Sequence, residues 1–88
     1  MDFYGKVKEL TEAVSGQGEK GLWVRRTLVV EAFDNPNSII AVDALNDRCD
    51  KLLEIRVGQA IKVSFGVNSR KSEKGYFTTL NLWDVQKL

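Results

Sequence analysis

The sequence predicts an all-β protein of five strands, with one short α-helix between the third and the fourth strand. Three observations carry this prediction. A run of β-branched, aromatic and long side chains extends from Gly21 to Phe33, and apolar and polar residues alternate from Ala60 to Asn68, which is the pattern of half-buried strands. Helical spacing of apolar residues is found between Asn46 and Glu54.

Length and composition limit the classes of protein that fit. The 88 residues are 43% hydrophobic and 28% charged, which predicts one globular domain over residues 1–88 that buries about 60 to 65% of its unfolded surface. No apolar run approaches the ~20 residues of a membrane span, and Met1–Gly5 lacks the features of a signal peptide. The only cysteine, Cys49, has no partner for an internal disulfide. We therefore expect a cytoplasmic protein without a membrane segment.

The first strand is expected over residues 3–10, and residues 11–14 continue it through a bulge as one long bent strand. Phe3, Gly5 and Val7 share one face of this strand. A glycine inside a strand indicates a bend where a second backbone comes close.

Residues 16–21 match the dinucleotide-binding pattern G-x-G-x-x-G, but their context argues against that function. The pattern binds pyrophosphate because a helix N-terminus follows the glycines. Here a strand follows, and the chain is too short for two nucleotide-binding halves. We interpret the segment as a flexible hairpin loop in which Lys20 offers one mobile cation.

The strand over residues 21–33 has two distinct faces. On the expected core face lie Leu22, Val24, Leu28, Val30 and Ala32, and on the opposite face lie Trp23, Arg25, Thr27, Val29 and Glu31. Arg26 interrupts the apolar face, so we expect its guanidinium near the barrel rim, because an unpaired buried charge is too costly. The row of Trp, Arg and Thr offers what a single-stranded nucleic acid requires: a π-face for a base, cations for phosphates and a small hydroxyl. The strand alone is equally compatible with Trp23 lying under a loop or in a dimer contact.

A turn over residues 34–38 is predicted from composition, and a third strand follows over 39–45. Residues 46–54 begin with cap-type residues and have the spacing of a short amphipathic helix. Cys49 lies on its apolar stripe and is expected to be a small buried hydrophobe, since no histidine is present to activate a thiol.

Two further strands are predicted over residues 60–68 and 76–85. They are joined by a polar hairpin loop over residues 69–75, which carries three cations and one acid. No single register places all the large apolar residues of the last strand inside, so we expect a bulge there. Phe77 and Trp83 are expected in the core.

This order of elements is the topology of the OB-fold, a five-stranded Greek-key barrel with a helix between its third and fourth strands. Three segments stand out within it: Gly5-x-Val7, then Trp23-x-Arg25-Arg26-x-Leu28-Val29-Val30-Glu31, and then Val57-Gly58-Gln59-Ala60-Ile61-Lys62-Val63 leading to Gly75-Tyr76-Phe77-Thr78. With these segments the sequence resembles the family of bacterial single-stranded DNA-binding proteins and a related set of short bacterial and phage proteins. The resemblance covers essentially the whole chain.

The resemblance and the residue chemistry indicate the same surface. In OB-folds the ligand crosses the second and third strands, flanked by the loops between strands one and two and between strands four and five. The residues predicted to bind nucleic acid there are Lys20, Trp23, Arg25, Thr27, Arg70, Lys71, Lys74 and Tyr76. The net charge is only +1, so binding depends on how charge is distributed over the surface. The expected partner is single-stranded DNA, with RNA left open, bound with little sequence specificity in replication, recombination or repair.

Catalysis is not expected. The sequence has no histidine, no second cysteine and no Gly-x-Ser-x-Gly, so we expect no catalytic residue, metal site or small-molecule cofactor. The alternative function is a protein-interaction OB module that uses Trp23 and its strand as a protomer or partner contact. A homodimer or higher homo-oligomer fits either function, because small barrels expose sheet edges. For Arg70, Lys71 and Lys74 the alternative is a solvated loop kept soluble by its charge.

Overall fold

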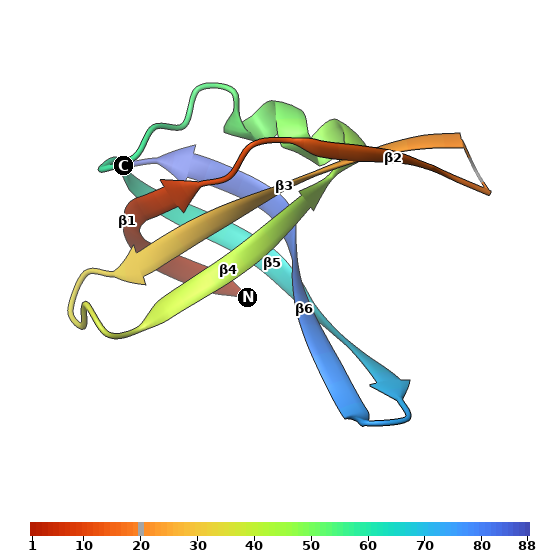
Figure 1. Ribbon diagram of the computed structural model, residues 1–88. Helices are drawn as coiled ribbons and strands as arrows, with labels where there is room; N and C mark the ends of the chain where they lie inside the picture. Colours follow the sequence, from red (N-terminus) through yellow and green to blue (C-terminus); the bar gives the residue numbers. More distant parts are fainter. Residues whose placement is uncertain (20) are drawn as a thin grey trace.

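The computed structural model describes residues 1–19 and 21–88 (Figure 1). In this part of the chain six strands and one 3₁₀-helix follow one another. They are β1 (Asp2–Leu10), β2 (Val14–Gly18), β3 (Gly21–Ala32), β4 (Ile39–Leu45), η1 (Asn46–Leu52), β5 (Ala60–Ser72) and β6 (Gly75–Lys87). Across residues 1–19 and 21–88, no helix is long and apolar enough to cross a membrane.

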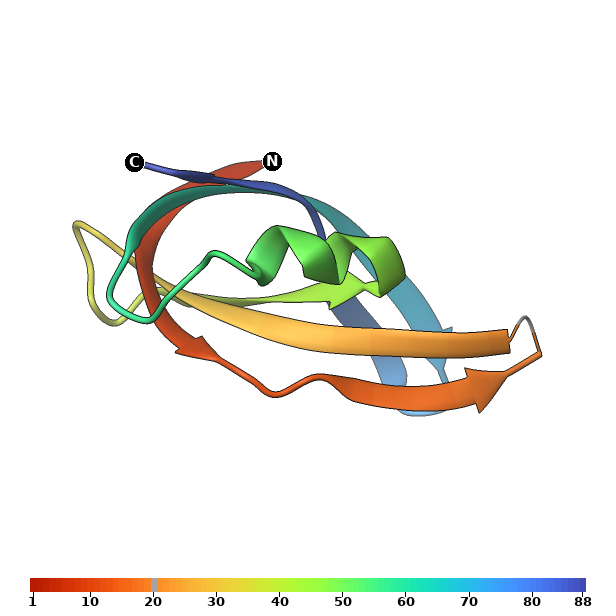
Figure 2. The ribbon, with the colours of Figure 1, turned by 90° about the horizontal axis from the view of Figure 1, so that it is seen from above.

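The strands form one sheet that closes into a barrel. Their order is β1-β5-β6-β4-β3-β2, and β1 also pairs with β3. The circuit is completed by β4 and β6, which run parallel and pair at Asp43 and Asn81. Five strands therefore make the barrel, β2 extends it beside β3, and the helical piece lies between β4 and β5, as the OB-fold prediction requires. Figure 2 shows β1 and β5 curving around the interior.

The core is apolar and is filled from every barrel strand and from the helical segment. Its members are Val7, Leu28, Val30, Val42, Ala44, Leu52, Ile55, Ile61, Val63, Phe65 and Leu82. The alternation of the sequence predicted this set well, because successive side chains of a strand point to opposite faces. Gly5 is required where β1 crosses β3. A Cβ at Gly5 would overlap the carbonyl oxygen of Glu31 and lie 2.8 Å from Cγ1 of Val30.

Two hairpins extend beyond the barrel (Figure 1). The β2–β3 arm consists of β2 and residues 21–25 of β3, and the β5–β6 arm consists of residues 67–72 and 75–80. Both arms are longer than predicted. The flexible loop expected over 16–21 is wrong because β2 continues to Gly18, and the loop expected over 69–75 is wrong because strand pairing continues to Ser72 and Gly75.

The start of the chain also differs from the prediction of one long bent strand. β1 ends at Leu10 and β2 begins at Val14, with a register shift between Val7 and Glu9 in the pairing of β1 with β3. Leu22 was expected in the core and is 82% exposed. By alternation Leu22 shares a face with the core residues Leu28 and Val30, but it lies in the β2–β3 arm, outside the barrel.

Hydrogen bonds of Thr11 hold the segment between β1 and β2 against β3. The Thr11 N–H donates to the carbonyl of Thr27 at 3.0 Å, and the Thr27 N–H donates to the Thr11 hydroxyl at 2.9 Å. Arg26 donates from Nε to the Thr11 carbonyl at 2.7 Å and is half-buried. Arg26 therefore lies at the rim with a polar partner, as predicted for a charge on an otherwise apolar face.

The helix expected over residues 46–54 is a 3₁₀-helix over Asn46–Leu52. Cys49, Leu52 and Ile55 follow at intervals of three, which is the repeat of a 3₁₀-helix, and they turn toward the barrel. Asn46 does not cap this helix. It has φ 51°, and its Oδ1 accepts a hydrogen bond from the Val24 N–H at 3.0 Å. Cys49 is half-buried against the core, close to its expected role.

Candidate nucleic-acid interface

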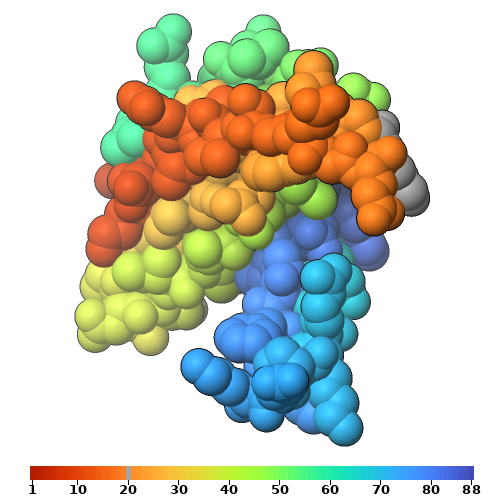
Figure 3. Space-filling model, turned by 45° about the vertical axis from the view of Figure 1, so that its right-hand side comes forward, coloured from red at the N-terminus to blue at the C-terminus, as the bar shows by residue number. Residues whose placement is uncertain are grey.

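A groove crosses the outer face of the barrel between the two arms. Three adjoining pockets make up this outer-face groove. The first holds Trp23 and Arg70, the second holds Arg25 and Arg70 with Asn68 and Thr79, and the third holds Arg48 and Trp83. The second and third share Asp43, Leu45 and Asn81. Figure 3 shows the hollow between the blue β5–β6 arm and the orange to yellow-green strands β3 and β4.

Trp23 is held at one end of the groove, outside the barrel core. It is half-buried and stands opposite Gly16 in the pairing of β2 with β3. A Cβ at Gly16 would overlap the indole ring, so the ring rests on the bare backbone of β2. A glycine opposite an aromatic residue on a strand pair is a known way to hold the ring flat.

Arg25, Thr27 and Asp43 lie on the same outward face of β3 and β4. The Thr27 hydroxyl donates to Oδ1 of Asp43 at 2.8 Å, which fixes both side chains. Thr27 is half-buried and committed to this bond, whereas Arg25 is exposed. Strand β3 positions these residues because alternation turns every second side chain outward while Leu28 and Val30 fill the core.

Of the predicted residues on the β5–β6 arm, Arg70 lies on the face toward the groove and the others do not. Arg70 pairs with Phe77 and lines the groove, while Lys71 pairs with Tyr76 on the opposite face. Lys74 lies in the turn at the tip of the arm. The structure therefore brings Trp23, Arg25, Thr27 and Arg70 together and places Lys71, Lys74 and Tyr76 elsewhere on the arm. Lys20 lies outside the described residues.

Two residues expected in the core are at the surface instead. Trp83 is 53% exposed and Phe77 is 60% exposed. A register shift between Ser64 and Phe65 confirms the bulge expected in β6. This bulge lets Leu82 and Val85 face inward while Trp83 stays outside. The signal for Trp83 was Gly66, a glycine on the outward face of a strand that otherwise alternates strictly.

The cations of the groove differ from those of the neighbouring surface. Lys51, Lys62 and Lys87 each form an ion pair, with Asp84, Asp2 and Glu54 respectively. Within residues 1–19 and 21–88, neither Arg25 nor Arg70 has a carboxylate at ion-pair distance. Both guanidinium groups are therefore available to an anion.

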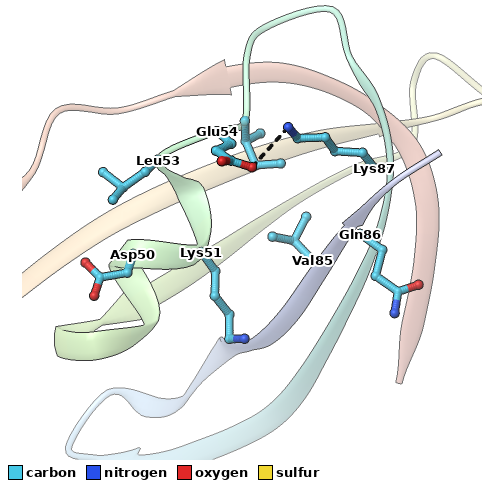
Figure 4. Close-up of a pocket in the computed structure, with 8 residues that line it drawn as sticks. Asp50, Lys51, Leu53, Glu54, Val85, Gln86 and Lys87 are labelled. Carbon is cyan, nitrogen blue, oxygen red and sulfur yellow. Dashed lines mark hydrogen bonds and ion pairs between the residues drawn. The ribbon is translucent and has the colours of Figure 1, made fainter.

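A separate pocket lies between η1 and β6, away from the groove (Figure 4). Its two lysines are Lys51 and Lys87, and both are paired with carboxylates. The hydrogen bond from Lys51 lowers the pKa of Asp84, with smaller contributions from the Val85 backbone and the charges of Lys51 and Arg48. This pocket offers an anion much less than the groove does, because both of its lysines already have carboxylate partners.

The chemistry of the groove is that of binding. Arginine forks contact phosphates, an indole face stacks a base, and amide and hydroxyl groups form hydrogen bonds. In the described part of the chain, no three His, Cys, Asp or Glu side chains gather closely enough to hold a metal ion.

The fold is an OB-fold barrel, and two solved single-stranded DNA-binding proteins share it. The chain belongs to the family described as a domain of unknown function, DUF3127, whose model matches residues 2–86. Comparison with curated proteins finds no match.

Two solved structures show the likeness of fold. The mitochondrial single-stranded DNA-binding protein Rim1 of S. cerevisiae superposes with a TM-score of 0.68 at 15% identity, over 100% of this chain and 92% of that chain. The small single-stranded DNA-binding protein of Streptomyces coelicolor superposes with a TM-score of 0.52 at 17% identity, over 99% of this chain and 91% of that chain. The predicted resemblance to such proteins is thereby confirmed at the level of the fold.

Proposed function

We propose that this protein binds single-stranded DNA in the outer-face groove, with little dependence on base sequence. The observation that carries the proposal is the combination of Trp23, held flat on Gly16, with two arginines that no described carboxylate neutralises. Arg25 on β3 and Arg70 on the β5–β6 arm line the same pocket of the groove. A DNA single strand lying between Arg25 and Arg70 would contact both guanidinium groups and the ring of Trp23.

The expected energetics follow from these groups. Stacking of one base on an aromatic ring contributes about 1 to 3 kcal/mol by truncation, and it is tolerant of sequence because every base has a π-face. Phosphates that contact arginines release condensed counterions, so affinity falls as salt rises. Contact with three or four phosphates would give a log-log slope of about −2 to −3, from the single-strand coefficient of about 0.7 per phosphate.

Two further considerations support the proposal. Both structural neighbours are described as single-stranded DNA-binding proteins. The groove also lies where OB-folds bind oligonucleotides, across the second and third barrel strands and between the two hairpin connections. Exposed single strands arise in replication, recombination and repair, and we place the protein in one of these processes, in the cytoplasm and without an enzymatic activity of its own.

The test is a titration of the protein with fluorescently labelled oligothymidine and with a duplex of equal length, at two salt concentrations. We expect tight binding of the single strand, weaker binding of the duplex, and the salt slope given above. An RNA strand of the same length in a parallel titration separates DNA from RNA. Failure to bind the single-stranded oligothymidine would contradict the proposal.

The alternative function, a protein-interaction OB module, is favoured by one observation. Tyr76 and Phe77 at the outer part of the β5–β6 arm are 72% and 60% exposed, and exposed aromatics are common at protein interfaces. Concentration-dependent association in sedimentation, without strand binding, would support this alternative. Association together with strand binding would show that a homo-oligomer presents the groove.

A further inference from the structure

Trp83 and Arg48 occupy the end of the outer-face groove opposite Trp23, and the predicted site did not include them. We propose that Trp83 is a second base-stacking platform and that Arg48 contacts the phosphate beside it. This inference rests on the proposed function, since it assigns a second contact point to the same strand.

The setting of Trp83 repeats that of Trp23. A Cβ at Gly66 would lie 2.6 Å from Cζ2, 2.9 Å from Cε2 and 3.1 Å from Nε1 of Trp83. The same three ring atoms of Trp23 would meet a Cβ at Gly16. Each indole therefore lies flat on a glycine of the neighbouring strand, with its body outside the core. Trp83 is 53% exposed, which leaves ring surface free for a base.

The surroundings of Trp83 fit a base better than a phosphate. Leu45 and Leu82 give the pocket apolar walls, and it has a volume of about 260 Å³. Asp43 pairs with Asn81 where this pocket adjoins the middle one, and its carboxylate can accept hydrogen bonds from the N–H groups of a base.

Arg48 provides the matching cation. Its Nη1 donates to the carbonyl of Trp83 at 3.2 Å, and the residue is exposed. This bond uses one of the five N–H groups of the guanidinium and holds it next to the platform. A phosphate that follows a base stacked on Trp83 would meet the remaining donors.

The two platforms imply a path for the bound strand along the groove. Trp23 and Trp83 line different pockets, and the middle pocket with Arg25 and Arg70 connects them. One continuous strand would stack a base at each end and place the phosphates between them on the two arginines.

The test uses each tryptophan as its own reporter. In the variant Trp23→Phe the only tryptophan is Trp83, and a dT oligomer of about 16 nucleotides, the upper end of OB-fold site sizes, should quench the tryptophan emission on binding. The variant Trp83→Ala should bind the same oligomer about 5- to 150-fold more weakly, which is the range of one base–aromatic stack. Gly66→Ala should reproduce part of that loss by displacing the ring.

Tyr4→Ala is the matched control, because Tyr4 is 52% exposed on β1 and does not line the groove. It should leave binding unchanged. If the Trp23→Phe protein binds the oligomer with no change in Trp83 emission, or if Trp83→Ala binds as tightly as wild type, the second platform is refuted while the proposed function stands. If the wild-type protein does not bind the oligomer, both fail.

Discussion

The two halves of strand β5 differ in burial. The first half belongs to the barrel, and the second half belongs to the β5–β6 arm. Ile61, Val63 and Phe65 are 0 to 6% exposed and belong to the barrel core. Beyond Gly66 the strand leaves the barrel, and its residues 67–71 are all exposed in the β5–β6 arm. The barrel half is held by burial of apolar surface, whereas the arm half is held mainly by pairing with β6. Stability and binding should therefore be separable by mutation.

The largest effect should come from the barrel. Leu28 is fully buried, and Leu28→Ala should lower the free energy of unfolding by about 2 to 5 kcal/mol because it removes apolar contacts and leaves a cavity. Urea denaturation measures this change. Oligothymidine affinity, measured well below the denaturation midpoint, should be nearly unchanged. A large loss of affinity in protein that is still folded would show that stability and binding cannot be separated by mutation.

Truncation of Trp23 should affect binding rather than folding. Trp23→Ala should weaken binding of oligothymidine by about 1 to 3 kcal/mol, at a much smaller cost in stability than the roughly 3 to 5 kcal/mol of a core tryptophan. Isothermal titration and thermal melting of the same variant give the two numbers. Because Trp83 also emits, the optical version of the titration should be repeated in Trp83→Phe. A variant that melts far below wild type, or binds as well as wild type, would contradict the platform role.

The two faces of the β5–β6 arm allow a sharper comparison between residues of equal charge. Arg70 lines the groove and its neighbour Lys71 faces away. Arg70→Ala should therefore reduce the magnitude of the salt slope by about 0.7, the share of one phosphate in a single strand, whereas Lys71→Ala should change it little. Both are exposed, so neither should alter thermal stability appreciably. Equal slopes for the two variants would indicate diffuse attraction to the arm instead of contact in the groove.

The smallest effect concerns the pH dependence of stability. The pKa of Asp84 is lowered from 3.8, mainly by the hydrogen bond from Lys51. A carboxyl whose folded pKa is lowered stabilises the protein above its ordinary pKa, and that contribution is lost as the pH falls below about 3.8. Asp84→Asn should remove this part of the acid-induced loss of stability. The change should be small because the pair is exposed, and Lys51→Ala should reproduce it.

The sequence predicted the barrel better than the arms, and the reason is burial. Alternation identified Leu28, Val30, Ile61 and Val63 because each must face an apolar interior. In the arms nothing is buried, so the polar run Ser69–Ser72 was interpreted as a loop although it pairs regularly with β6. Hairpin pairing without burial leaves little trace in a hydropathy pattern.

The candidate site was predicted in part. Trp23, Arg25 and Arg70 converge as expected, because topology and alternation place them. Lys71 and Tyr76 were included because OB-folds flank their ligand with this hairpin connection, and register, which a sequence does not show directly, sets them on the other face of the arm. Trp83 was assigned to the core because large aromatics are often buried. Gly66 beside it was the feature that could have indicated an exposed ring.

Amide chemical-shift mapping can show directly whether a DNA single strand lies in the outer-face groove. A ¹⁵N-labelled sample is titrated with oligothymidine and the shifted amides are assigned. If the strand lies in the groove, the shifts should cluster in residues 21–27, 43–45, 66–70 and 79–83. Shifts concentrated around Glu54 and Lys87, in the pocket between η1 and β6, would contradict it, and so would the absence of any shift at saturating strand.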